Sequence, residues 1–236
     1  MLEHQAEYQV VETAEKSVQA SFIKKTYGHL AGAILAFVVV EFILFQTPLK
    51  AAMINMLAVS PWSWLIVLVL FMVVGYVAEK WAHSNVSSGM QYVGLGVYVL
   101  AEAIIFLPLL YIAQQLAGPT LILNAAILTA VLFTALTYVV FTTGKDFSFL
   151  SGILKIGAFI ALGVIVLSIA LGFSLGLLFS AVMVIFASGA ILYTTSQVLR
   201  EYSPRQHVGA SLALFAAVAL LFWYILRILI ALGSDD

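Results

Sequence analysis

Seven long apolar runs, separated by short polar breaks, constrain this chain more than any other feature of its sequence. They cover residues 26–45, 61–82, 90–113, 120–142, 147–171, 174–199 and 208–232. A helix crosses the hydrocarbon core of a bilayer with about 20 apolar residues, and backbone groups in lipid must hydrogen-bond within their own segment. The sequence therefore predicts an all-α membrane protein built as a bundle of seven transmembrane helices.

The composition indicates that lipid is the solvent for most of the chain. Hydrophobic residues make up 64% and charged residues only 9%, with a mean hydropathy of +1.12. The net charge of −1 gives no reason to expect a nucleic-acid partner, and the absence of cysteine excludes disulfides and thiolate metal sites. We expect the lipid bilayer to be the main partner, and we expect neither a cofactor nor a bound metal ion.

Basic residues predict how the chain is oriented. Residues 1–25 form a polar tail before the membrane domain of residues 26–233, and this tail lacks the basic-then-apolar order of a cleavable signal. With seven spans, one side of the membrane receives Lys24, Lys25, Lys80, Lys145, Arg200 and Arg205. Lysine and arginine accumulate in cytoplasmic loops. The N-terminal tail is therefore expected in the cytoplasm and the C-terminus outside.

Small and polar residues within the spans have a packing interpretation. Gly28 and Gly32 form a GxxxG pair in the first span, which is typical of closely packed membrane helices. The fourth span carries a polar stripe that includes Thr129, Thr134 and Thr137. Because a threonine hydroxyl readily hydrogen-bonds to its own helix backbone, this stripe favours packing over a water path.

Three ionisable residues lie inside the predicted spans, where an unpaired charge costs several kcal/mol. The helical rise places Glu41 roughly 22 Å, Glu102 roughly 18 Å and Lys155 roughly 12 Å from the cytoplasmic edge. Side chains at that depth normally face the interior of the bundle and find a partner. Glu102, Glu41 and Lys155 are therefore the candidates for an ion or proton pathway.

Three arrangements of these residues remain open. Glu102 and Lys155 are close enough in depth to form a buried salt bridge that fixes helix packing. Alternatively, Glu41 and Glu102 meet and share one proton, as two neighbouring carboxylates do. In the third arrangement Glu41 reaches lipid headgroups, and Glu102 is protonated and hydrogen-bonded to a neighbour such as Tyr98, one helical turn earlier.

The sequence offers no arrangement for catalysis within the membrane. An intramembrane serine protease needs a histidine beside its serine, and no histidine lies in the middle of a span. There is no H-E-x-x-H run for zinc. A retinal protein would need a lysine in the last span, whereas the lysine within a span is Lys155 in the fifth. We therefore expect no enzymatic activity.

Four stretches carry a resemblance to a known family. They are FIKKTYGHLAGAIL at 22–35, KDFSFLSG at 145–152, SGAILYTTSQVL at 188–199 and SLALFAAVALLFWYILRILIALG at 211–233. In this order they resemble the Bax inhibitor-1 family of seven-helix membrane proteins, and within it the bacterial YccA-like branch. The resemblance implies a last helix wrapped by the other six and a place in the bacterial inner membrane.

The resemblance also implies two functions. Some members conduct a pH-dependent calcium leak through a pair of acidic residues, and those two positions match Thr194 and Ala217, which are not acidic here. We expect a pH-sensitive leak of calcium or protons, although the acidic pair is missing. YccA-like members instead interact with the membrane protease FtsH, so the alternative is a modulator of that protease acting through the cytoplasmic tail.

Overall fold

The computed structural model describes residues 10–83 and 87–233, which form only helices. They are η1 (Val11–Thr13), α2 (Lys16–Phe45), α3 (Leu49–Val59), α4 (Pro61–Ala82), α5 (Ser88–Ala117), α6 (Pro119–Thr143), α7 (Leu150–Leu171), α8 (Leu177–Arg200) and α9 (His207–Gly233). Among these residues, 7 helices are long and apolar enough to cross a membrane, namely α2 and α4 to α9. The predicted seven-helix membrane bundle is confirmed.

Local sequence explains where several helices begin and end. Pro61 is the first residue of α4, and the Ser60 hydroxyl accepts a hydrogen bond from the backbone N–H of Trp62 at 3.2 Å. Proline suits this position because its missing N–H is not needed there. Gly144 and Gly172 end α6 and α7 with φ values of 58° and 72°, a left-handed conformation that glycine adopts without strain.

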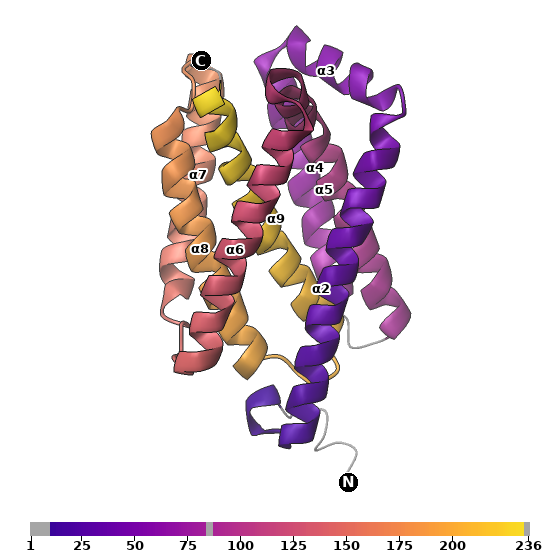
Figure 1. Ribbon diagram of the computed structural model, residues 1–236, viewed down its shortest axis with the longest axis vertical. Helices are drawn as coiled ribbons and strands as arrows, with labels where there is room; N and C mark the ends of the chain where they lie inside the picture. The colour runs from indigo at the N-terminus through magenta and orange to yellow at the C-terminus, as the bar shows by residue number, and fades with distance from the viewer. Residues whose placement is uncertain (1–9, 84–86, 234–236) are drawn as a thin grey trace.

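Two helical features lie outside the seven apolar runs. The short helix α3 lies at the upper end of the bundle, beside the ends of the long helices (Figure 1). Its 11 residues are too few to cross a bilayer. Helix α2 begins at Lys16 rather than at Thr26, because the polar segment before the span continues the same helix and buries Phe22.

The segment before α2 is attached to the connection between α8 and α9. The backbone N–H of Val11 donates to the carbonyl of Tyr202 at 2.9 Å, and the Val11 side chain is 1% exposed. Glu12 forms an ion pair with Arg200 at 2.6 Å. Residues 10–15 are therefore part of the folded structure at the end of the bundle that carries Arg200. We call this the basic end.

Helix α9 crosses the middle of the bundle diagonally (Figure 1) and packs directly against α2, α4, α5, α6 and α8. Helix α7 lies outside this group and packs against α8 and α4. Of the six helices expected to wrap the last one, five pack on α9 directly, and α7 lies across a cavity, described below, that α7 and α9 both line.

Glycines bring some helices close together and leave others apart. A Cβ atom added at Gly94 of α5 would lie 2.5 Å from the carbonyl oxygen of Ala78 in α4, so only glycine allows this approach. A Cβ at Gly209 of α9 would lie 2.9 Å from the carbonyl oxygen of Ala82. At Gly28 and Gly32 it would meet nothing within 4 Å. The predicted close contact of the GxxxG pair is therefore wrong within the described part of the chain.

Candidate functional site

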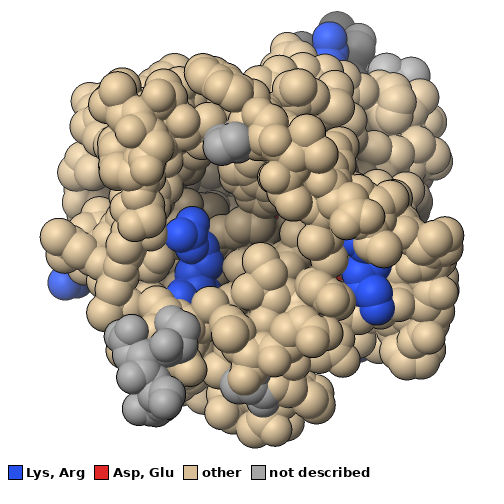
Figure 2. Space-filling view, turned by 90° about the horizontal axis from the view of Figure 1, so that it is seen from above, with Lys and Arg blue, Asp and Glu red and all other residues tan. Residues whose placement is uncertain are grey.

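A cavity of about 680 Å³ lies between α4, α5, α7, α8 and α9. Arg227 of α9 lines it near the end opposite to the basic end, where its guanidinium donates to the carbonyl of Leu175, in the connection between α7 and α8, at 3.1 Å. Seen from this end, the molecule has a largely uncharged surface with a hollow, and a lysine or arginine side chain lies at the edge of the hollow (Figure 2). The cavity is therefore accessible from the end of the bundle that lies away from the N-terminus.

Glu102 supplies the carboxylate among the residues that line the cavity. The side chain is 6% exposed, and its hydrogen-bond partner is the side chain of Tyr98, one turn earlier on α5. Tyr98 lines the cavity as well. The local partner expected for Glu102 from the helical spacing is therefore the one that the structure has, and the pair faces open space rather than lipid.

The salt bridge between Glu102 and Lys155 does not form. Lys155 is exposed on the surface of α7, and α7 does not pack against α5. Residues of α7 such as Ser168 line the cavity from the side opposite to Glu102. The depth estimate was insufficient because depth along the membrane normal says nothing about which helices are neighbours.

Glu41 and Glu102 do not share a proton directly. Glu41 is 6% exposed, and neither of its carboxylate oxygens has a hydrogen-bond partner within the described residues. Glu41 is not among the residues that line the cavity. The structure therefore gives Glu41 no partner with which to share a proton within the described residues.

The two positions that match the family's acidic pair line the same cavity as Glu102. Thr194 comes from α8 and Ala217 from α9. Both side chains are uncharged, and within the described residues no group of three His, Cys, Asp or Glu side chains is arranged to hold a metal ion. Calcium takes six to eight oxygen ligands, usually including several carboxylates. The cavity therefore has one carboxylate in a place where calcium would need several.

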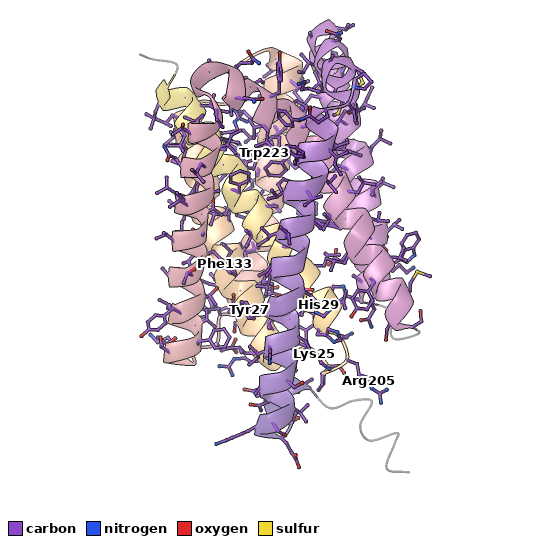
Figure 3. All side chains as sticks on the ribbon, turned by 45° about the vertical axis from the view of Figure 1, so that its right-hand side comes forward. Lys25, Tyr27, His29, Phe133, Arg205 and Trp223 are labelled. Carbon is purple, nitrogen blue, oxygen red and sulfur yellow. The ribbon has the colours of Figure 1, made fainter. Side chains whose placement is uncertain are left out.

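A cluster of three hydroxyl groups, none of which lines the cavity, includes the residue that follows Thr194 on α8. Thr195 follows Thr194 on α8 and is 0% exposed. Its hydroxyl and that of Thr137 interact with the hydroxyl of Tyr27, although none of the three forms a hydrogen bond of good geometry. Figure 3 shows Tyr27 in the half of the molecule nearer Lys25 and Arg205, and Trp223, which lines the cavity, in the other half.

This cluster was not among the sites predicted from the sequence. Thr129 and Thr134 of the predicted polar stripe donate to their own helix backbone at 2.7 Å, as expected, whereas the Thr137 hydroxyl does not. The signal that was available is three consecutive polar residues on a buried helix, Thr194, Thr195 and Ser196, which are 8%, 0% and 2% exposed. Three consecutive helical residues cannot all face the same neighbour, so this run serves more than one contact.

Ser196 connects the two most specific sequence motifs. Its hydroxyl accepts from the backbone N–H of Phe147 at 3.1 Å and lies 3.5 Å from the carboxylate of Asp146. Asp146 also accepts from the backbone N–H of Ser148 at 2.8 Å, which lowers the pKa of its carboxyl below the usual value, with a smaller contribution from Arg200. The KDFSFL stretch therefore contacts the last two turns of α8 through the Ser196 side chain.

Comparisons with known proteins agree with these motifs. The sequence model of the family described as "Inhibitor of apoptosis-promoting Bax1" matches residues 19–234. The chain is 38% identical over 120 residues to a Pseudomonas aeruginosa protein, covering 50% of this chain and 54% of that protein. It is 35% identical over 102 residues to the Escherichia coli "Modulator of FtsH protease YccA", covering 43% and 46%. It is 25% identical over 229 residues to "Bax inhibitor 1" of Schizosaccharomyces pombe, covering 94% and 80%.

The matches to the bacterial relatives cover only part of each relative. The chain spans about half the length of the bacterial relatives it matches most significantly, whereas the family model covers nearly all of the chain. Seven helices suited to a membrane and a relative described as an inner membrane protein agree with this assignment. The chain is an integral multi-pass protein of the inner membrane and belongs to the Bax inhibitor-1 family, with the YccA-like proteins among its relatives.

Proposed function

We propose that this protein is a pH-sensitive proton leak pathway in which Glu102 is the group that takes up the proton. The observation that carries the proposal is the position of Glu102 with Tyr98 on the wall of a cavity of about 680 Å³ that is accessible from one end of the bundle. An ionisable residue at membrane depth that faces a cavity typically belongs to an ion or proton route. The role proposed is transport and not catalysis.

Protons fit this cavity better than calcium. The carboxylate of Glu102 can hold one proton without further ligands, whereas calcium takes six to eight oxygen ligands that usually include several carboxylates. Arg227 places a fixed positive charge where a cation would enter, and its repulsion of a divalent ion is twice that of a monovalent ion at the same distance. A proton can pass such a charge by transfer between water molecules and side chains.

The route towards the basic end would continue through the hydroxyl cluster of Tyr27, Thr137 and Thr195. Thr194 lines the cavity about 9 Å along the helix from the last residue of α8, so the barrier that remains is thin. Hydroxyl groups can both accept and donate a proton. The basic residues predict that this end lies in the cytoplasm; the cavity would then face outward and the cluster would form the inner barrier.

The test is proton flux into liposomes that contain the full-length protein, with an internal pH-sensitive dye. Glu102→Gln is expected to abolish the flux that rises with external acidity. The matched control is Glu41→Gln, which makes the same change at a buried carboxylate outside the cavity and is expected to leave the flux unchanged. If Glu102→Gln conducts protons as the wild type does, or if Glu41→Gln abolishes conduction, the proposal is wrong. A calcium dye in parallel distinguishes the two ions.

A second candidate function is modulation of a membrane protease, and it rests on the similarity to the Escherichia coli FtsH modulator. The sequence predicts that the tail of residues 1–25 would bind the protease. Val11 is held by Tyr202 and Glu12 by Arg200, so the test removes only residues that precede these two contacts. Deleting residues 2–9 should then stabilise or destabilise a protease substrate in cells, while Glu102→Gln should have no effect on it.

A further inference from the structure

A second hollow, separate from the cavity, runs between α2 and α5 on the surface of the bundle. It is a groove of about 840 Å³ whose lining includes Lys24, Lys25 and His29 at the basic end and Val40 and Leu100 at the other. None of the residues assigned to the proton route lines it. Because α2 and α5 both span the membrane, most of this groove faces the hydrocarbon of one leaflet.

Glycines keep the groove open. Gly28, Gly32 and Gly96 line it, and a Cβ atom added at any of them would meet nothing within 4 Å. At Gly94, by contrast, the backbone of α4 occupies the space that a Cβ atom would need. Helices in lipid gain their stability from close packing, so a row of small residues without a packing partner leaves room for another molecule.

The charges at the basic end indicate the chemistry of that molecule. Lys24 and Lys25 are exposed, and neither forms an ion pair with any residue of 10–83 or 87–233. Beside them, His29 donates from Nδ1 to the carbonyl of Lys25 at 2.7 Å and shares a hydrogen bond of 3.0 Å between Nε2 and the hydroxyl of Tyr92 on α5. Figure 3 shows Lys25 and His29 at this end, one turn apart on α2. A phosphate group would find two ammonium groups at the mouth of an apolar groove.

The length of the groove favours a lipid over a transmembrane helix. From His29 to Val40 the helical rise gives about 16 Å, which is about half of the roughly 30 Å hydrocarbon core. An acyl chain of one leaflet has this length, whereas a spanning helix of a partner or of a second copy would make contact over the whole core. We propose that the groove binds an anionic phospholipid, with its phosphate at Lys24 and Lys25 and one acyl chain along Gly28, Gly32 and Gly96.

The experiment is native mass spectrometry of the full-length protein released from nanodiscs of phosphatidylglycerol and phosphatidylcholine in equal amounts. The wild type is expected to retain phosphatidylglycerol in preference to phosphatidylcholine. Each lysine near an anionic lipid contributes about a fivefold preference, so Lys24→Gln with Lys25→Gln should remove most of it. The control is Lys80→Gln with Lys145→Gln, which removes two other basic-end lysines that do not line the groove.

A second pair of variants tests the groove itself. Gly32→Leu places a side chain in the groove at a position where its Cβ atom meets nothing within 4 Å, and is expected to lose the retained lipid. Gly163→Leu on α7, which also has open space, is the control and should retain it. Equal retention of both lipids by the wild type, or unchanged retention by Gly32→Leu, would overturn the proposal. A dimer that Gly32→Leu dissociates would overturn it in favour of a second copy in the groove.

Discussion

The contact between α4 and α5 at Gly94 makes the sharpest prediction about packing in this bundle. A Cβ atom at Gly94 would lie 2.5 Å from the carbonyl oxygen of Ala78 and 2.6 Å from the backbone nitrogen of Ala82. Both neighbours are backbone atoms of a helix, so neither can turn aside as a flexible side chain would. To reach an ordinary contact of about 3.4 Å, the two helices must separate locally by about 0.9 Å.

Gly94→Ala is therefore expected to destabilise the protein, and Gly96→Ala is its matched control. Both changes lie on α5, and both gain about 1 kcal/mol because alanine has the higher helix propensity. At Gly96 the methyl group enters open space, so that gain remains. At Gly94 overpacking costs about 1–3 kcal/mol or more. The difference between the two variants isolates this cost, because the propensity gain cancels.

The assay is thermal unfolding of both variants in the same detergent, followed by the fluorescence of the tryptophans. For a chain of this size about 1 kcal/mol corresponds to about 2–4 °C, so Gly94→Ala should melt several degrees below Gly96→Ala. Gly209→Ala, where the nearest backbone atom is at 2.9 Å, should fall between them. If Gly94→Ala melts at or above the temperature of Gly96→Ala, the close approach of α4 and α5 is not the reason for glycine there.

Three further predictions concern other parts of the molecule. Tyr98→Phe removes the hydrogen-bond partner of Glu102 and should lower the free energy of unfolding by about 1–3 kcal/mol. The double variant Tyr98→Phe with Glu102→Gln should lower it by less than the sum of the two single changes. Val11→Ala removes part of a side chain that is 1% exposed and should weaken the attachment of the N-terminal segment by about 1.5 kcal/mol. Limited proteolysis before residue 16 should then be about tenfold faster. An unchanged rate would show that the segment is not held there. Hydrogen bonds hold the pKa of Asp146 below the usual value, so its ionised form stabilises the connection between α6 and α7 at neutral pH. This contribution is present above the ordinary pKa of an aspartate and is lost as the pH falls through the lowered pKa. The protection of the Ser148 amide from hydrogen exchange should therefore not change through this effect between pH 7 and pH 5, and Asp146→Asn should reduce that protection at pH 7.

The seven spans could be predicted because lipid imposes a simple rule on the backbone. Each run of apolar residues had to be a helix, and markers such as Pro61 and Gly144 lie at observed helix ends. The side of the membrane follows from the basic residues and stays a prediction. Helix α3 was missed because 11 residues between two spans carry no such rule.

The site could be predicted only in part, because a sequence gives depth along the membrane but not which helices are neighbours. Glu102 was recognised from its depth, and Tyr98 from its helical spacing. Lys155 has a suitable depth but lies on an exposed face of α7. The glycines show the same limit: Gly94 closes a contact and Gly32 leaves one open, although both lie in similar apolar surroundings in the sequence.

The central position of α9 has a consequence for how the protein is made. Helices leave the ribosome in chain order, so the helix that touches α2, α4, α5, α6 and α8 is the last of the seven to enter the membrane. Until then the earlier helices have no common core, and the half-built protein presents groups such as Glu102 and Thr195 to lipid or to the translocation machinery. A chain cut short before His207 would stay in that unfinished state, which is the kind of substrate that quality control removes.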